Sequence, residues 1–407
     1  MYTSSMDPFQ KLAILGQAHE DRCGPCGQAP RPRKDTSRLE GIAHCALPGG
    51  GSLPVLRVLY TNHCERDCAY CVHNRNMDVP RVGFRPEELV RLFETLYRKG
   101  AVRGLFLTSG VTRNPDTVTQ RMVDCVTRLR QRGFQGYVHL KIMPGASDAA
   151  VEAAMAVATR VSINLEAPSA RRLSRLTSTK SFQEILDKIR RIRALQAAHP
   201  RWVPAGQVTQ FVVGGAGESD AEILDVVARL YRELGLKRVY YSAFTPVPGT
   251  ALEGRAPTPP LREHRLYQAD WLLRDYGFQR EELVLDPDGN LPLAADPKLA
   301  WALHHPERFP VEVNTVPERE LLRVPGIGPL SARRIVALRR TARIRSLRDL
   351  SRLGVAVSRA RGFLLLDGKA PAPPVGERRQ LCLPWEEDRE GSGKPLGPEP
   401  ALPRSVY

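Results

Sequence analysis

The chain of 407 residues lacks an apolar run long enough to cross a membrane. No window approaches roughly 18 consecutive apolar residues, and the first residues lack a basic region followed by an apolar one. Cysteine is scarce as well: the chain has eight, and three of them fall within an eight-residue stretch. This distribution argues against a secreted disulfide framework and favours metal or cluster ligands in a reducing compartment. We therefore expect a cytoplasmic protein.

Acidic residues are in deficit, with 44 Asp and Glu against 60 Lys and Arg, so the formal net charge is +16. A basic balance favours a polyanionic partner, but it does not by itself distinguish DNA from RNA or from a membrane surface. The excess is concentrated in one segment. Residues 318–369 hold 13 Lys and Arg against 4 Asp and Glu, a net charge of +9 in about an eighth of the chain.

Three cysteines follow an apolar run, Val55 to Tyr60, that predicts a strand. They are Cys64, Cys68 and Cys71, a Cys-x3-Cys-x2-Cys spacing on one short loop. Three thiolates suit iron–sulfur chemistry or zinc, and they leave one iron of a 4Fe-4S cluster open. An open iron can bind a substrate or cofactor directly. The alternative is a closed zinc site in which His73 supplies the fourth ligand.

From residue 55 to residue 250, apolar runs alternate with amphipathic helical windows, which is the pattern of repeated βα units on a parallel sheet. Because parallel barrels carry their chemistry at the C-terminal strand ends, the residues just past each strand are the candidates for a site. Six units are predicted, with strands at Leu53–Tyr60, Gly104–Thr108, Tyr137–Ile142, Arg160–Leu165, Gln207–Val213 and Arg238–Phe244.

The cysteine spacing, with the aromatic Tyr70 directly before the last cysteine, resembles the signature of the radical S-adenosylmethionine (SAM) superfamily. The resemblance implies a partial (β/α) barrel whose three cysteines hold a 4Fe-4S cluster. It also implies that SAM chelates the open iron, and that one electron from an electron donor cleaves it to methionine and a 5′-deoxyadenosyl radical. Tyr70 would contact the adenine.

Several strand ends resemble that superfamily's pattern. Ser109 and Gly110 follow the second strand in the place of a Gly-Gly-Glu motif, although the Glu is absent, and would meet the methionyl ammonium. Asn164 and Glu166 follow the fourth strand, where the superfamily often contacts the ribose or carboxylate of the cofactor. Val213 ends the fifth strand in a run that resembles a Gly-x-Ile-x-Gly-x-x-Glu motif without its first glycine, and is predicted to contact the cofactor.

The sequence does not identify a catalytic acid. Lys141, Glu166, Gln210 and Tyr241 fall at strand ends where they would face the barrel mouth, and a buried lysine or carboxylate there can transfer a proton. Of these four, Lys141 and Tyr241 are the candidates for a catalytic role. The same residues would also serve as cofactor contacts or as ion pairs that line the barrel.

A second segment, residues 320–340, places the turn Pro325-Gly-Ile-Gly328 between two predicted helices and resembles a helix-hairpin-helix DNA-binding motif. Without Cβ atoms, the turn glycines let backbone N–H groups approach a phosphate, and the following helix N-terminus adds its positive dipole. Residues 346–366 repeat this pattern without a second turn glycine. The alternative is a hairpin used for packing or for docking a protein. The predicted DNA contacts are Gly326, Ile327, Gly328, Ser331, Arg333 and Arg334.

The span from about Pro54 to Leu366 resembles a bacterial family described as DNA modification or repair radical SAM proteins, in which such a barrel precedes a helix-hairpin-helix. The predicted fold is α/β, a partial barrel of six units followed by a small all-α module. Cys23, Cys26 and Cys45 are either ligands of a second cluster or zinc ion, or free thiols. The predicted parts are an N-terminal extension (1–52), the barrel (53–255), a helical linker (256–312), the hairpin module (313–369) and a disordered tail (370–407).

The function predicted from the sequence is that of a radical enzyme brought to DNA by the hairpin, which contacts the backbone with weak sequence preference. There the 5′-deoxyadenosyl radical abstracts a hydrogen atom from a base or sugar to modify or repair it. Three alternatives stay open: an RNA-modifying radical enzyme, a small-molecule radical enzyme, and a zinc-stabilised DNA-binding adaptor without catalysis.

Overall fold

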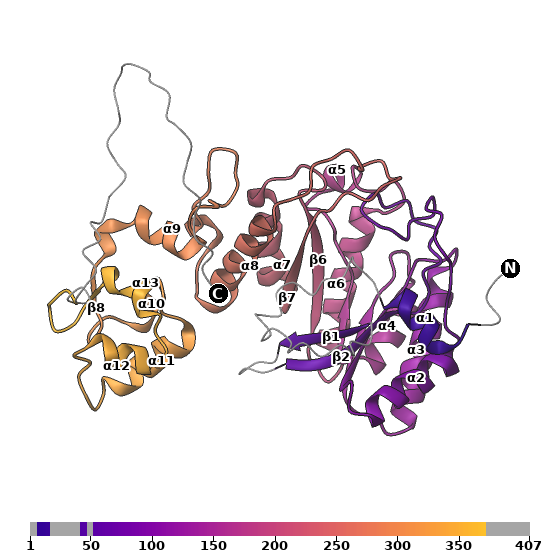
Figure 1. Ribbon diagram of the computed structural model, residues 1–407, viewed down its shortest axis with the longest axis horizontal. Coiled ribbons are helices and arrows are strands. Elements are labelled where there is room, and N and C mark those ends of the chain that lie inside the picture. Colours follow the sequence, from indigo (N-terminus) through magenta and orange to yellow (C-terminus); the bar gives the residue numbers. More distant parts are fainter. Residues whose placement is uncertain (1–5, 17–40, 47–51, 372–407) are drawn as a thin grey trace, which may run out of the picture.

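The structure is a computed structural model that describes residues 6–16, 41–46 and 52–371. The pair Cys23 and Cys26, and the predicted tail from residue 372 onward, lie outside the described residues. Figure 1 shows a large α/β domain and, beside it, a smaller helical part formed by the C-terminal elements. None of the helices in the described part is long and apolar enough to cross a membrane.

One curled sheet of seven strands, a half-barrel, forms the centre of the α/β domain, and its strands lie side by side in chain order. The first strand pairs antiparallel with the second, and all later neighbours are parallel. The strands are β1 (Ile42–Ala46), β2 (Ser52–Leu59), β3 (Gly104–Thr108), β4 (Tyr137–Lys141), β5 (Arg160–Ser162), β6 (Gln207–Val213) and β7 (Arg238–Ala243).

The six predicted strands correspond to the parallel strands β2–β7, but the predicted strand count is wrong because β1 adds a seventh. β1 is a five-residue edge strand, and an edge strand held mainly by backbone pairing carries little of the apolar periodicity that reveals central strands. β5 is shorter than predicted and ends at Ser162. The chain beyond it keeps only a single bridge, between Glu166 and Phe211 of β6.

Helices connect the parallel strands, and their starts follow from the local sequence. Proline stands in the first turn of four helices of this domain, and Ser147, Ser181 and Ser219 each cap a helix by accepting the N–H three residues on. The helices of this domain are α1 (Pro8–Leu15), α2 (Pro86–Arg98), α3 (Pro115–Gln131), α4 (Asp148–Val157), α5 (Ala170–Leu173), α6 (Phe182–Ala198), α7 (Asp220–Leu234) and α8 (Pro260–Asp275).

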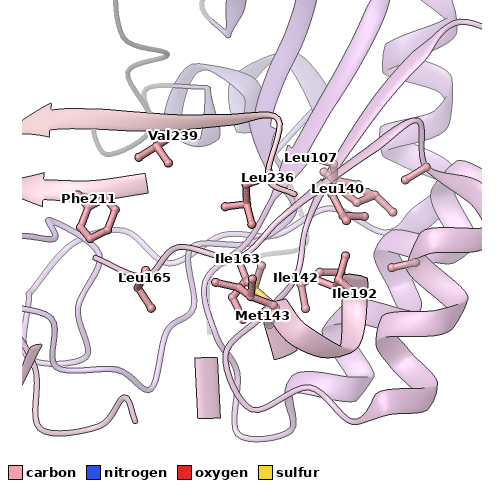
Figure 2. Packing of buried hydrophobic residues seen from close by; sticks show 14 of the residues in the cluster. Leu107, Leu140, Ile142, Met143, Ile163, Leu165, Ile192, Phe211, Leu236 and Val239 are labelled. Carbon is pink, nitrogen blue, oxygen red and sulfur yellow. The ribbon is translucent and has the colours of Figure 1, made fainter. Parts of the chain in front are cut away.

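The main hydrophobic core lies between the strands and these helices. Figure 2 shows Ile142, Met143 and Ile163, which follow β4 and β5, gathered near Ile192 of α6. All four side chains are at most 1% exposed. Burying a side chain of this kind stabilises the fold by about 1.5–3 kcal/mol relative to leaving it in water. Packing of these residues therefore fixes the positions of the ends of β4 and β5.

The C-terminal part has a hydrophobic core of its own, formed by residues between Val311 and Leu366. A parallel pair of two-residue strands closes it, which brings its first and last residues together. Its elements are β8 (Val311–Glu312), α10 (Glu318–Leu321), α11 (Pro329–Leu338), α12 (Leu347–Arg352), α13 (Val357–Ala360), the 3-10 turn η4 (Arg361–Phe363) and β9 (Leu364–Leu365). The core and the strand pair of the predicted module (313–369) extend over residues 311–366, and from here on the hairpin module means residues 311–366.

The junction between the α/β domain and the hairpin module contains η2 (Arg280–Glu282), α9 (Pro297–His304) and η3 (Pro306–Arg308). Arg323 of the module anchors this junction. Its guanidinium lies 3.7 Å from the ring centroid of Phe278 and 5.3 Å from that of Trp301, and it pairs with Glu282 at 2.8 Å. Cation–π contacts and an ion pair on one half-buried arginine therefore attach the module to the helices that follow β7.

Candidate active site

The cysteine loop, residues 62–77, follows the C-terminal end of β2, and Arg81 makes four hydrogen bonds to its backbone. Arg81 donates through Nη1 to the carbonyl oxygens of Asn62 and His73, at 2.7 and 2.8 Å. Through Nη2 it donates to the carbonyl oxygens of Asn74 and Met77, at 2.6 and 2.9 Å. One guanidinium thus satisfies four loop carbonyls that no regular secondary structure pairs.

Asp67, inside the cysteine loop, ties it to the segment 176–180. Its carboxylate accepts the hydroxyls of Thr177 and Thr179, at 2.5 and 2.7 Å, and also the hydroxyl of Ser178. Burial alone raises the pKa of Asp67, but the hydrogen bonds from these three residues outweigh it and hold the pKa well below its usual range. A carboxylate ionised in this way anchors the loop throughout the physiological pH range.

The three cysteine sulfurs are sheltered and none forms a disulfide. Cys68 and Cys71 are buried and Cys64 is half-buried. The backbone N–H of Val111 donates to Cys64 Sγ at 3.4 Å, and that of His73 donates to Cys71 Sγ at 3.3 Å. Backbone N–H groups aimed at sulfur stabilise thiolates and tune the potential of an iron–sulfur cluster.

The chemistry of the donor set fits a 4Fe-4S cluster. Within the described residues, no group of three or more His, Cys, Asp or Glu side chains is gathered as for a single metal ion. Each thiolate of a cluster binds a different iron, whereas a zinc ion takes all of its ligands at one centre. Cys64, Cys68 and Cys71 would thus hold three irons of a 4Fe-4S cluster and leave the fourth iron open.

The end of β3 packs directly under the cysteine loop. A Cβ atom on Gly110 would lie 2.4 Å from the carbonyl oxygen of His63 and 3.2 Å from Cβ of Cys64, so only glycine permits this approach. Ser109 Oγ donates to the carbonyl oxygen of Thr61 at 3.4 Å. The structure thus brings the two predicted residues next to the cluster ligand Cys64.

Glu166, Lys180 and Tyr70 form a buried group beside the loop. Lys180 Nζ lies 3.0 Å from Glu166 Oε1 and donates to the Tyr70 hydroxyl at 2.8 Å. The side chains of Lys180 and Glu166 are 9% and 4% exposed. Burying this ion pair removes both charges from water, which costs free energy. The close contact between the two groups and their other hydrogen bonds must offset that cost.

Glu166 has two further features of a binding residue. Its φ is +67°, a left-handed conformation that costs a residue with a Cβ about 1–2 kcal/mol and that two backbone hydrogen bonds to β6 enforce. Its second oxygen, Oε2, is buried and accepts no hydrogen bond from any described residue. An unsatisfied buried carboxylate oxygen is ready to accept a hydroxyl or N–H of a ligand.

A pocket of about 700 Å³ opens at the ends of β6 and β7, next to Tyr70. Val212, the segments 242–247 and 257–260, and Glu263 complete its lining. The carboxylate of Glu218 accepts the backbone N–H groups of Gly214 and Ala216 and thereby shapes the turn after β6. The volume is in the range that holds small-molecule ligands and cofactors, about 300–1,000 Å³.

Two other predicted cofactor contacts, Asn164 and Val213, do not line this pocket. Asn164 faces the barrel interior, where it lines a cavity of only about 20 Å³. Val213 is fully buried, and its carbonyl oxygen already accepts the N–H of Phe244 and the hydroxyl of Thr258. Its neighbour Val212 is the residue that lines the pocket.

The expectation that Tyr241 faces the barrel mouth is wrong. Tyr241 is fully buried between β7 and α8, where its hydroxyl donates to Asp270 at 3.2 Å and its backbone bonds to the Tyr267 hydroxyl. Burial, and then the Asp270 carboxylate, raise the pKa of Tyr241 well above its usual value. Tyr240 is the residue that lines the barrel interior, and Lys141 is half-buried at the end of β4. One residue of offset on a strand decides which face a side chain takes.

Sequence reasoning missed Lys180, Asp67 and Arg81. Lys180 follows no predicted strand and stands just before the cap of α6, so no strand-end rule selects it. Asp67 accepts hydroxyls of a segment more than 100 residues along the chain, and Arg81 donates to backbone carbonyls of the cysteine loop, so no strand-end rule selects either residue.

In the hairpin module, the two turn glycines serve different purposes. Gly326 has a φ of +87°, and a Cβ there would lie 2.5 Å from the carbonyl oxygen of Ala356, so this glycine is required where the two helix pairs meet. Gly354 of the second pair, with a φ of +86°, packs reciprocally near Ser331. At Gly328, by contrast, a Cβ would meet only the Tyr276 hydroxyl oxygen, at 3.4 Å.

Of the remaining predicted DNA contacts, Arg333 and Arg334 are exposed, whereas Ile327 and Ser331 are buried. The side chains of Ile327 and Ser331 therefore contribute to packing, and any contact they make with DNA would come from their backbone.

Residues 58–230 match the family model of the Radical SAM superfamily. This region is a radical SAM domain. Enzymes of the superfamily, biotin synthase among them, use a 4Fe-4S cluster and SAM, so the predictions of an enzyme and of these two cofactors are confirmed. In this chain Cys64, Cys68 and Cys71 are the residues that would hold the cluster.

Curated relatives include the biotin synthase of Nitratidesulfovibrio vulgaris strain Hildenborough, 29% identical over 289 residues, which covers 63% of this chain and 75% of that enzyme. The biotin synthase of Persephonella marina is 26% identical over 211 residues, covering 49% of this chain and 56% of that enzyme. The chain thus spans between about half and three quarters of these relatives.

Solved structures similar to this one include the FeFe-hydrogenase maturase HydG from Carboxydothermus hydrogenoformans and methylornithine synthase (PylB). HydG has a TM-score of 0.44 at 14% identity, with 53% of this chain and 50% of that chain covered. Methylornithine synthase has a TM-score of 0.41 at 16% identity, with 51% and 59% covered.

Proposed function

We propose that this protein is a radical SAM enzyme that modifies or repairs DNA, to which the basic hairpin module binds it. The observation that carries the proposal is the joining, in one chain, of a radical SAM domain to a module with its own core and an exposed basic surface. A small separately cored module is not needed to complete the barrel, so binding is its most direct use.

The residues of the site have separate tasks. When bound, the cluster and SAM would supply a 5′-deoxyadenosyl radical, which abstracts a hydrogen atom from the substrate. Cys64, Cys68 and Cys71 would hold the cluster, and the backbone N–H groups that Val111 and His73 direct at Cys64 Sγ and Cys71 Sγ would influence its reduction potential. Glu166 offers its free oxygen to a hydroxyl or amine of the ligand, while Lys180 supplies the compensating charge.

The hairpin module offers phosphate-binding charge rather than base-reading groups. Six of its exposed arginines have no ion-pair partner among the described residues: Arg333, Arg334, Arg340, Arg345, Arg348 and Arg352. Arginines on an open surface neutralise backbone phosphates and release counterions, so we expect affinity that falls steeply with salt and discriminates weakly between sequences.

The test is to incubate the anaerobically reconstituted full-length chain with a reductant, SAM and duplex or single-stranded DNA. Nucleosides and 5′-deoxyadenosine are then followed by mass spectrometry. We expect 5′-deoxyadenosine together with a nucleoside of changed mass, both absent from the Cys68→Ala variant. If 5′-deoxyadenosine and a changed nucleoside form with tRNA but not with DNA, the substrate is RNA and the proposal is wrong.

A second candidate function is a radical enzyme of small molecules, which the likeness to biotin synthases favours. In that case the hairpin module would serve another purpose. The two functions separate in one comparison, because a small-molecule enzyme would keep its turnover when Arg333, Arg334 and Arg348 are all changed to Gln, whereas the DNA enzyme would lose most of it.

A further inference from the structure

A cavity of about 250 Å³ lies between the hairpin module and the helices α8 and α9, apart from the cysteine loop and its pocket. The turn Gly326–Gly328 forms one wall. Gln268, Tyr276 and Lys298 face it from the α/β side, and Arg359 faces it from α13. The polar lining combines the cationic donors of Lys298 and Arg359 with the side chains of Gln268 and Tyr276, which can donate or accept, and with the carboxylate of Asp296.

Lys298 is the deepest of these groups. It is 7% exposed, its ammonium donates to the carbonyl oxygen of Ile327 at 2.5 Å, and it lies 4.7 Å from the ring centroid of Tyr276. An ammonium has three N–H groups, and burying it with one neutral acceptor is unfavourable unless an anion joins it. Burial is accordingly the main cause that lowers the pKa of Lys298 to about 7.

The charged groups near Lys298 come from each element around the cavity. Asp296 at the cap of α9 favours the ammonium, whereas Arg359 and Arg323 oppose it. The Asp296 carboxylate is already engaged, since it pairs with Arg359 and accepts the N–H of Leu299 in the first turn of α9. The cavity therefore holds more positive charge than the chain itself neutralises.

The turn adds unused backbone donors. α11 begins at Pro329 with no side-chain cap on Gly328. The backbone N–H groups of Gly328, Leu330 and Ser331 donate to no described residue. Uncapped N–H groups at the start of a ten-residue helix attract anions through hydrogen bonds and the helix dipole.

We propose that this cavity binds a phosphate of the DNA backbone, with Lys298 and Tyr276 of the α/β side completing the site that the hairpin turn begins. The inference rests on the proposed function and deepens it. The volume of about 250 Å³ admits a tetrahedral anion and its water. A phosphate bound here would contact the hairpin module on one side and the helices α8 and α9 on the other. DNA would therefore bridge these two parts of the protein.

The test measures duplex DNA binding by the full-length chain over a range of salt, by fluorescence anisotropy. Lys298→Gln removes the charge, and Gly328→Val places a side chain in the cavity at a backbone conformation that valine accepts. We expect each to weaken binding about tenfold and to lower the slope of log affinity against log salt by about one. The double variant should be no weaker than the stronger single one, because both act on one phosphate.

Matched controls carry the same chemical changes elsewhere. Lys99→Gln removes an exposed lysine on the barrel, and Gly362→Val adds a side chain to the module where a Cβ meets nothing within 4 Å. Both should bind as the parent does. Circular dichroism and thermal unfolding check that all four variants fold.

The substitution Asp296→Asn distinguishes two interpretations of the cavity: a phosphate-binding site, or a contact that only holds the module in place. Asparagine keeps the cap of α9 but removes a negative charge from the cavity and the ion pair with Arg359. A phosphate site predicts several-fold tighter DNA binding, whereas a structural latch predicts equal or weaker binding. Tight binding by the parent that neither Lys298→Gln nor Gly328→Val weakens would overturn the inference alone. A parent that binds no DNA would remove the proposed function and this inference with it.

Discussion

The ammonium of Lys180 lies 3.0 Å from the carboxylate of Glu166 and 2.8 Å from the hydroxyl of Tyr70. This contact joins three chain segments at the mouth of the barrel: the cysteine loop, the segment after β5 and the approach to α6. Because the pair is buried, its two charges depend on each other for compensation, and removing one leaves the other in a medium that disfavours it.

Lys180→Met should therefore destabilise the protein by about 3–5 kcal/mol, since the Glu166 carboxylate loses its counter-charge. The double variant Lys180→Met/Glu166→Gln should recover most of that loss in urea denaturation, because no charge is left unpaired. It should still bind SAM poorly by calorimetry. The control is Lys188→Met, which breaks a surface pair with Asp148 and should cost about 0–1 kcal/mol. Equal losses at the two lysines would contradict the assignment.

Replacing Cys64, Cys68 or Cys71 singly by Ala should abolish the cluster and the cleavage of SAM. The measurements are iron and acid-labile sulfide content and the yield of 5′-deoxyadenosine in anaerobic protein. Cys125→Ala is the matched control, since burial raises the pKa of that thiol to about 12 and keeps it protonated and away from metal chemistry. Stoichiometric zinc without sulfide in iron-replete, oxygen-free preparations would remove the radical mechanism.

The two turn glycines of the hairpin module should respond differently to alanine. Gly326→Ala forces a Cβ into the left-handed region and against the carbonyl oxygen of Ala356, so a loss of at least about 1–2 kcal/mol is expected. Gly328→Ala meets only ordinary contact and should stay within about 0.5 kcal/mol of the parent. The free energy of unfolding of each variant is measured by chemical denaturation, with the helical circular dichroism signal as the readout. Similar losses would mean that Gly328 is also required for packing.

Lys298 should give the protein a stability that rises with pH. Its folded pKa is about 7, well below the usual lysine value of about 10.4. Between these values the unfolded chain binds one more proton than the folded chain, so the free energy of unfolding increases by up to about 1.4 kcal/mol per pH unit. Denaturation at pH 7, 8 and 9 should show this slope in the parent and not in Lys298→Met, with Lys99→Met as the exposed control. Parallel curves for the parent and Lys298→Met would contradict the prediction.

Arg333→Gln/Arg334→Gln should weaken DNA binding evenly across sequences and lower the salt slope by about two, because each arginine neutralises about one phosphate. The pair Arg91→Gln/Arg98→Gln, exposed on α2 of the barrel, serves as the charge-matched control. If this control lowers affinity as much as the hairpin pair, the basic charge acts non-specifically over the whole surface.

The parallel strands and the cysteine loop could be predicted from the sequence because both depend on short-range patterns. The buried parallel strand β3 is a nearly continuous apolar run and β6 ends in one, and the predicted bounds of both match the structure. The cluster ligands are named by spacing alone, since three cysteines within eight residues must lie on one loop.

Only the tertiary structure decided which side chains meet at the site. Tyr240 and Tyr241 differ by one position on β7 yet face opposite sides of the sheet, and the parity of a strand is set by its pairing register. Gly326 and Gly328 share one turn, but what each approaches depends on a second helix pair and on α8. Lys180 meets Tyr70 across 110 residues of chain. No local periodicity encodes such contacts, because they arise from how separately formed elements pack together.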